Sequence, residues 1–449
     1  MTIDASVVMP DAGTAAPHVD ASVDTAPPHD AALAVDSGVA RSIIDPGTGP
    51  WKLVPRADVP EVCRLDPALL DAADKALQTY NPDGVRWAVV RYGRLCYASH
   101  ADAPADEAFS TTKTLGALVL GTVAYQTREL SRNGRKTGPL SDEDRVDHWL
   151  DDIPYNKEAH IAHVLGMVAH NPDLALGKKT MTYDIVGATQ INSLSTVMNA
   201  AIAQDAMRLG ANLEEFTRRF VFGPLGMTSS AWSDGSPDKT LGFSWSTSAL
   251  DMARIGLLML HGGMWNGARI LSEEYIYRMT HPSFEDANTG YGYLTWLNAA
   301  SNFTFGDIPG APEGKQQKPM NPGPCAPVSV FRQHPHGLSD SKDCNYASPD
   351  QCAQRFDVGV WAAVGMQGQV IFGHPGLDMV ITVKNLTPLL AGGTTDYGFG
   401  PETPRIVWDA LFPAIVSGDP MYHGNSDAFC AAYGSNSYAP DLDANETAP

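Results

Sequence analysis

A Ser-x-x-Lys pattern is the feature of this sequence with the clearest potential for chemistry. When the serine stands at the start of a helix, the lysine follows one turn later on the same face, so the amine can take the hydroxyl proton and make the oxygen a nucleophile. The amine must be neutral to do so, and burial or nearby positive charge can lower its pKa far enough. The pattern thus indicates a nucleophilic serine with a lysine base.

Context separates the three occurrences of this short pattern, which are Ser110/Lys113, Ser236/Lys239 and Ser339/Lys342. Ser236 precedes a proline in a polar turn, and Ser339 lies in a segment that carries cysteines, so neither opens a helix. Ser110 begins a long apolar helical pattern, whose N-terminus would bring free N–H groups and a positive dipole end to the hydroxyl. Ser110 and Lys113 are therefore the predicted nucleophile and base. The alternative is a helix-capping serine beside a solvated lysine.

Other catalytic and metal-binding signatures are missing from the sequence. It has no Gly-x-Ser-x-Gly, no His-Glu-x-x-His and no phosphate-binding loop of the P-loop type. His334 and His336 lie near three cysteines, but the spacing is irregular and the context is rich in proline. We expect a disulfide-stapled insertion at residues 303–356, and we predict no metal and no cofactor.

Composition excludes several classes of function. The 449 residues are 43% hydrophobic and 18% charged, which is too apolar for a disordered protein, and no apolar run is long enough to predict a transmembrane helix. The 31 basic and 51 acidic side chains give a net charge of −20, and this sign repels the phosphates of nucleic acids. We therefore predict no nucleic-acid partner. The oligomeric state stays open, and the small-molecule substrate that we expect follows from the motifs rather than from composition.

Periodicity predicts a sheet built from both ends of the chain. Helical spacing covers residues 66–78, 111–130, 161–168, 213–222, 248–260 and 405–415, and strand patterns cover residues 87–91, 95–99, 358–364, 369–372 and 379–384. This order predicts an α/β fold in which an antiparallel sheet flanked by helices carries an inserted all-helical domain. We place the sheet domain at residues 46–130 and 290–426, and the helical domain at residues 131–289.

The two ends of the chain and the cysteines bear on localisation. Residues 1–45 and 427–449 are acidic and lack large apolar clusters, so we expect a disordered tether and a flexible tail. The first segment has no basic region followed by an apolar region, so it contains no secretory signal. Six cysteines without a Cys-x-x-Cys pair favour disulfides of an exported or surface-tethered protein, in any of the roughly 15 pairings that six cysteines allow. Buried thiols of a cytoplasmic protein are the alternative.

Several segments resemble the serine β-lactamase and penicillin-binding-like hydrolases, in the branch with class C β-lactamases, carboxylesterases and 6-aminohexanoate-dimer hydrolases. Phe-Ser-Thr-Thr-Lys-Thr at 109–114 is similar to the nucleophile helix of that family, and Phe-Gly-Pro-Leu-Gly-Met at 222–227 is similar to its Pro-Leu-Gly-Met turn. Residues 246–272 are the most specific match, to a helix and loop of the esterase and amidase members. The resemblance spans residues 60–300 and 358–415 and implies a β-lactamase/transpeptidase-like fold that forms an acyl-enzyme.

The resemblance also implies a tyrosine that shares the proton transfer, within a Tyr-x-Asn motif that none of the 15 tyrosines matches. Position favours Tyr183, because residues 177–187 are similar to the family's tyrosine segment, although Asp184 and Ile185 replace the usual Ser and Asn. Tyr155 is the second candidate, but it precedes the predicted helix at residues 161–168, which is too early for the family's tyrosine segment. A tyrosine that only packs beside a helix start is the alternative for Tyr183.

The family's Lys-Thr-Gly motif belongs on a late strand, whereas the literal string here lies at residues 136–138, in a basic loop without strand character. Residues 363–366, Ala-Val-Gly-Met, match the expected position. The resemblance then implies that the N–H groups of Ser110 and Met366 form the oxyanion hole. Gly365 would contact the substrate there.

The same segment bears on substrate class. Ala363 stands where the family has a cation that holds a substrate carboxylate, and a carboxylate without a cation in a partly buried site is costly. Trp296 and Trp361 are candidate apolar pocket walls, although core packing explains them as well. We therefore predict a serine hydrolase that cleaves uncharged esters or small amides. The alternatives are a β-lactamase or D-Ala-D-Ala carboxypeptidase, and a penicillin-binding-like module that binds without hydrolysis.

Overall fold

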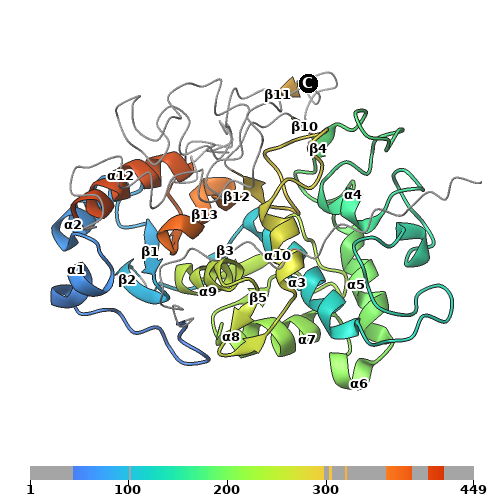
Figure 1. The fold of residues 1–449 in the computed structure, drawn as a ribbon, viewed down its shortest axis with the longest axis horizontal. Helices are drawn as coiled ribbons and strands as arrows, with labels where there is room; N and C mark the ends of the chain where they lie inside the picture. The colour runs from blue at the N-terminus through green and yellow to red at the C-terminus, as the bar shows by residue number, and fades with distance from the viewer. Residues whose placement is uncertain are drawn as a thin grey trace, which may run out of the picture. The chain divides into compact units, whose positions relative to one another are not determined.

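A computed structural model gives the arrangement of the chain (Figure 1) and describes residues 44–100, 103–297, 303–305, 319–320, 360–386 and 403–418. Residues 1–43 of the predicted tether, the predicted acidic tail and most of the predicted insertion lie outside these residues. Ser339, Lys342 and four of the six cysteines also lie outside them.

A six-stranded antiparallel sheet joins the two ends of the chain, in the order β2-β1-β14-β13-β12-β9. Its strands are β1 (Arg86–Arg91), β2 (Arg94–Ser99), β9 (Trp296–Leu297), β12 (Trp361–Gly365), β13 (Gln369–His374) and β14 (Met379–Lys384). Strand β1 pairs with β14 along its whole length, from Arg86 opposite Lys384 to Arg91 opposite Met379. The predicted α/β fold class, with a sheet closed by strands from both ends of the chain, is thus confirmed.

Helices cover both faces of the sheet, which is why every residue of β13 and β14 is buried. On one face lie α2 (Pro67–Gln78) and α12 (Thr403–Gly418), which contact each other and appear side by side in Figure 1. Asp66 caps the start of α2 by accepting backbone N–H groups. Trp408 of α12 stacks on His374 and contacts Phe372 of β13.

The opposite face carries α3 (Thr111–Thr127) and α9 (Ala249–Leu260). At Gly256 of α9 a Cβ atom would lie 2.5 Å from Val380 Cγ1 and 2.9 Å from Ile371 Cγ2, so the close approach of helix and sheet requires a glycine. Helix α9 lies in the range that we predicted for the helical domain, yet it packs on the sheet. Helix α3 is buried on nearly all sides, between β12, α5 and α10.

The middle of the chain is mainly helical. Its helices are η2 (Val146–His148), α4 (Ile161–Leu165), α5 (Ser193–Ala203), α6 (Ala206–Leu209), α7 (Leu213–Thr217), the π-helical turn η3 (Arg218–Phe222), α8 (Gly223–Leu225) and α10 (Glu273–Thr280). The pattern over residues 213–222 therefore corresponds to two elements, α7 and η3.

Short strands also occur there, whereas the sequence predicts an all-helical block. They are β4 (Met181–Tyr183), β5 (Ala231–Trp232), β6 (Trp245–Thr247), β7 (Met264–Trp265) and β8 (Ala268–Arg269). Strand β5 pairs with β6 and β6 with β3 (Asp106–Glu107), while β4 pairs in parallel with β10 (Phe303–Phe305), which in turn pairs with β11 (Pro319–Met320). Strands of two or three residues are too short to show an alternating pattern. Residues 303–305, predicted as the start of the insertion, thus form the middle strand of a three-stranded sheet.

A disulfide joins Cys63 to Cys96, which links the end of α1 (Val59–Val62), after η1 (Arg56–Asp58), to β2. The two cysteines are 33 positions apart, and cross-linking a loop of that length removes unfolded-state entropy worth about 3–4 kcal/mol. No thiol is free among the cysteines that the structure describes. Within the described ranges, none of the helices combines the length and the apolar character needed to cross a bilayer.

Candidate active site

Ser110 stands at the N-cap position of α3, directly after β3 and two further residues. Its side chain makes no capping hydrogen bond to the described helix, which argues against the capping-serine alternative. The preceding Phe109 has a φ of +47°, a left-handed conformation that costs a residue with a side chain about 1–2 kcal/mol. Strain of this kind gathers at functional sites. Here it turns the chain from β3 into α3 and places the Ser110 hydroxyl at the turn.

Lys113 lies one turn further along α3 and is only 1% exposed. Its Nζ atom is 3.1 Å from Ser110 Oγ, 2.7 Å from the carbonyl oxygen of Ile185 and 2.9 Å from that of Gly242. A neutral amine has two N–H groups and one lone pair. The two carbonyls can accept both N–H groups, which leaves the lone pair for the Ser110 hydroxyl. The geometry therefore suits a lysine that accepts a proton from Ser110.

The electrostatic environment also favours a neutral amine. Burial lowers the pKa of Lys113 from its ordinary 10.5 to about 7, and the negative charge of Asp184 acts in the opposite direction. The Asp184 carboxylate accepts the backbone N–H groups of Gln190 at 2.7 Å and Ile191 at 3.1 Å. Because these bonds already satisfy the buried carboxylate, it has no need of Lys113 as an ion-pair partner. A large fraction of Lys113 is thus neutral at pH 7.

Tyr183 ends β4, and its hydroxyl is hydrogen-bonded to Ser110. The centre of its ring lies 5.2 Å from Lys113 Nζ. Burial raises the pKa of the phenol above its usual range, so the hydroxyl keeps its proton and can donate it. Tyr155, the second candidate, instead shares a 2.8 Å hydrogen bond with Ser193 Oγ. Of the two, the structure brings Tyr183 to the Ser110–Lys113 pair.

The end of β12 lies against the backbone around Ser110. Strand β9 pairs with Trp361 and Ala362, and the rest of this edge of β12 extends past it toward α3. A Cβ atom on Gly365 would lie 2.6 Å from the carbonyl oxygen of Ala108 and 3.2 Å from the Ser110 nitrogen. The approach therefore requires a glycine at position 365, and it places the backbone of residues 365–366 next to that of Ser110.

The two tryptophans predicted as pocket walls differ in their surroundings. Trp296 stacks on the Tyr183 ring, with centres 5.3 Å apart, and Phe303 of β10 contacts both rings. Trp361 lies against Gly373 of the neighbouring strand, four residues along β12 from Gly365, which is about 13 Å in an extended chain. Trp296 therefore belongs to the Tyr183 environment, whereas Trp361 packs in the core.

The other occurrences of the motifs have different surroundings. Lys239 is buried, but its Nζ atom is paired with Glu214 at 2.9 Å, and Ser236 is exposed. Lys136, from the literal Lys-Thr-Gly string, pairs with Asp151 in a loop without strand structure. In the described contacts neither lysine amine is hydrogen-bonded to a serine hydroxyl, although the backbone N–H of Lys239 donates to Ser195 Oγ at 2.6 Å.

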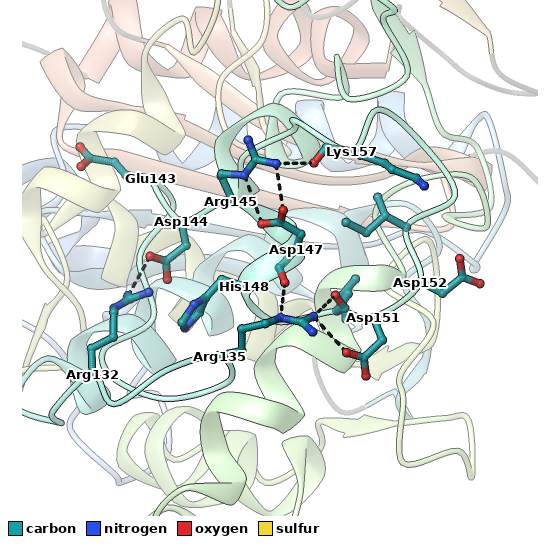
Figure 2. Close-up of a pocket in the computed structure, with 12 residues that line it drawn as sticks. Arg132, Arg135, Glu143, Asp144, Arg145, Asp147, His148, Asp151, Asp152 and Lys157 are labelled. Carbon is teal, nitrogen blue, oxygen red and sulfur yellow. Dashed lines mark hydrogen bonds and ion pairs between the residues drawn. The ribbon is translucent and has the colours of Figure 1, made fainter.

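A charged surface hollow of about 730 Å³ lies in the same loop region (Figure 2). Its arginines are already paired: Arg132 with Asp144, Arg145 with Asp147, and Arg135 with Asp151. The hollow contains none of the predicted site residues, and the balance of its charges favours no particular ligand.

Sequence patterns missed the groups that hold the Lys113 amine. Ile185 and Gly242 act through backbone carbonyls, which every residue has, so residue type gives no signal. The only hint in the sequence is the glycine at positions 187 and 242, because a side chain at either position would collide with the opposite loop.

No family model matches this chain, and no curated protein matches it. Solved structures do resemble it, and they include β-lactamases, penicillin-binding protein homologues, a carboxylesterase and a 6-aminohexanoate-dimer hydrolase, the families that the sequence motifs resemble. A penicillin-binding protein homologue from Caulobacter crescentus is 11% identical with a TM-score of 0.47, over 77% of this chain and 97% of that chain.

Two further structures give similar values. A family VIII carboxylesterase is 12% identical with a TM-score of 0.47, over 77% of this chain and 97% of that chain. A β-lactamase from Mycobacterium bovis is 17% identical with a TM-score of 0.42, over 81% of this chain and 99% of that chain. At this level of similarity, function has to be inferred from the site itself.

Proposed function

We propose that this protein is a serine hydrolase of the β-lactamase-like type, which cleaves uncharged esters or small amides through an acyl-enzyme. The observation that carries the proposal is the position of the Lys113 amine, buried between two carbonyls and 3.1 Å from Ser110 Oγ. A lysine that is neutral near pH 7 and faces a hydroxyl is the arrangement needed to activate a serine.

In the first half of the reaction, the Lys113 lone pair takes the Ser110 proton while Oγ bonds to the substrate carbonyl carbon. The carbonyl π electrons move onto its oxygen, which becomes an oxyanion. When the tetrahedral intermediate collapses, the bond to the leaving group breaks, and that group departs with a proton donated by the Tyr183 hydroxyl. The proton held by Lys113 then passes to the Tyr183 phenolate, which restores the phenol. The products are an ester on Ser110, a free alcohol or amine, and a neutral Lys113.

In the second half, water replaces the leaving group. As the water oxygen attacks the acyl carbon, Tyr183 takes a proton from the water and passes its own proton to Lys113. The bond from that carbon to Ser110 Oγ then breaks, and Ser110 recovers its proton. The acid product leaves, and the three side chains regain their starting protonation states.

The oxyanion would accept hydrogen bonds from the backbone N–H groups of Ser110 and Met366. The support for this assignment is the contact between the end of β12 and the Ser110 backbone, together with the dipole at the start of α3. N–H groups fixed by a strand and a helix need no reorganisation when the charge develops.

The proposed substrate class follows from the position of Ala363, which is buried on β12 and offers neither charge nor donor. A substrate carboxylate would lose a charge-assisted hydrogen bond there, whereas a neutral acyl group would lose nothing. Trp296, which lies against Tyr183, supports an apolar contact beside the reacting centre. The disulfide between Cys63 and Cys96 supports the further proposal that the protein is exported.

Labelling with a fluorophosphonate probe tests the proposal. Wild-type protein should gain one adduct at Ser110 and should turn over p-nitrophenyl acetate steadily after a burst. Ser110→Ala should lose both activities, and Ser236→Ala, which alters an exposed serine of the same motif, should keep both. Labelling that survives in Ser110→Ala would contradict the proposed nucleophile, and a burst without turnover would indicate a binding module.

A further inference from the structure

The amide side chain of Asn192 lies between the two loops that hold the Lys113 amine. Its Oδ1 atom accepts the backbone N–H of Gly242 at 3.2 Å, and its Nδ2 atom donates to the carbonyl of Val186 at 3.4 Å. Gly242 supplies one carbonyl to Lys113, and Val186 follows Ile185, which supplies the other. One side chain therefore contacts both loops next to the atoms that bind Nζ.

Asn192 makes these contacts instead of the one expected at its position. It is the N-cap residue of α5, where asparagine usually accepts a backbone N–H of its own helix, yet its side chain makes no such bond to the described helix. Its backbone N–H donates to the Gly187 carbonyl at 2.8 Å, which fixes the start of α5 to the first loop. The side chain thus serves the loops rather than the helix end.

The two loops are in direct contact, so a small change between them reaches the amine. A Cβ atom on Gly242 would lie 2.2 Å from the Val186 carbonyl oxygen, and one on Gly187 would lie 2.2 Å from Asn192 Oδ1. Neither glycine can be replaced without moving a carbonyl-bearing loop. The spacing of the two carbonyls, and hence the direction of the Lys113 lone pair, depends on this junction.

We propose that Asn192 is a positioning residue, which locks the two carbonyl-bearing loops together so that the Lys113 amine stays dehydrated and directed at Ser110. The catalytic importance of Asn192 rests on the proposed function, whereas the effect of Asn192 on the pKa of Lys113 does not. The titratable groups that face Lys113 are Tyr183 and Asp184, while the 240–243 loop presents a backbone carbonyl. Loosening the junction admits water to Nζ, which stabilises the ammonium form.

The test compares Asn192→Ala with Asn199→Ala. Asn199 lies on the same helix and is also half-buried. Its side chain joins Leu213 to Pro237 and Asp238, which stand five and four residues before Gly242, and in the described hydrogen bonds it contacts neither Gly242 nor residues 185–187. We expect Asn192→Ala to move the acid limb of the pH profile of kcat/KM upward by about one unit, and to lower kcat/KM at pH 7 about fivefold. Asn199→Ala should leave the midpoint of that limb unchanged, whatever it does to Tm.

A second variant and a second measurement cover the case in which Asn192→Ala folds poorly. Gly242→Ala keeps Asn192 but forces the loops apart, and it should raise the same midpoint. The pKa of Lys113 can also be read directly from ¹³C NMR of labelled lysine in a Ser110→Ala background, where no turnover is needed. An unchanged Lys113 midpoint in both Asn192→Ala and Gly242→Ala would overturn the proposal. Wild-type protein without Ser110 labelling would overturn the hydrolase assignment instead, and the NMR titration would still decide the role of Asn192.

Discussion

Replacing Gly365 with alanine should remove most of the activity without unfolding the protein. The added methyl group would lie 2.6 Å from the Ala108 carbonyl oxygen and 3.2 Å from the Ser110 nitrogen, and both are backbone atoms that cannot rotate away. Carbon and oxygen need more than 3 Å, so the end of β12 and the start of α3 must separate by about half an ångström or more. The Ser110 and Met366 N–H groups would then no longer converge on one oxygen.

The expected loss is about 10²-fold in kcat, because a displacement of this order costs about 10²-fold and removal of one oxyanion donor costs about 10²–10³-fold. The assay is steady-state hydrolysis of p-nitrophenyl acetate, with Tm measured on the same samples. Gly235→Ala is the matched control, since a Cβ atom there meets nothing within 4 Å. A Gly365→Ala protein with kcat within twofold of wild type would refute the assignment of this strand end to the oxyanion.

Three further outcomes follow from the site. Because Lys113 must be neutral and burial lowers its pKa to about 7, kcat/KM should fall about tenfold per pH unit below pH 7. Lys113→Arg should be nearly inactive, since a guanidinium stays protonated. A flat pH profile of kcat/KM from pH 5 to 8 would contradict the role of Lys113 as the base. Tyr183→Phe should lower kcat about 10²-fold or more, whereas the control Tyr155→Phe should not. A Tyr183→Phe enzyme with normal kcat would show that another group transfers the proton. The value of kcat/KM should be about one to two orders of magnitude higher for short p-nitrophenyl esters than for nitrocefin or D-Ala-D-Ala peptides. The reason is that Ala363 offers no contact to a substrate carboxylate, and such a contact is worth about 1.5–3 kcal/mol. The reverse order of kcat/KM would indicate a β-lactamase.

The elements that the sequence predicted well are those with long patterns and clear ends. Helix α2 has an aspartate cap followed by proline, and its apolar residues recur at helical spacing over three turns. The hairpin of β1 and β2 turns at Gly93, as the pattern indicates, and β14 is rich in residues that favour strands. The side chains of Ser110 and Lys113 meet because three positions along a helix is nearly one turn, which is a property of the spacing alone.

What the sequence could not predict depends on backbone atoms and on long-range contacts. The carbonyls of Ile185 and Gly242 reach Lys113 from segments 72 and 129 positions away, and nothing in their residue types distinguishes them. Trp296 and Trp361 are residues of the same type in similar apolar strand sequences, yet Trp296 lies beside Tyr183 and Trp361 lies against a core glycine. The two strands are neighbours, and because Trp296 is opposite Ala362, the side chains of Trp296 and Trp361 point to opposite sides of the sheet.

The burial of Lys113 has a consequence for folding. Unfolded lysine titrates near 10.5 and native Lys113 near 7, so between these values the unfolded chain binds more protons than the native one. The free energy of unfolding therefore rises with pH from about 7 to about 10.5, and at or below pH 7 the buried amine costs on the order of 5 kcal/mol. That cost is comparable to the whole net stability of many domains, so the sheet, its two helical layers and the Cys63–Cys96 link must offset it. The side chain on which the proposed chemistry depends therefore makes the fold less stable at neutral pH than at alkaline pH.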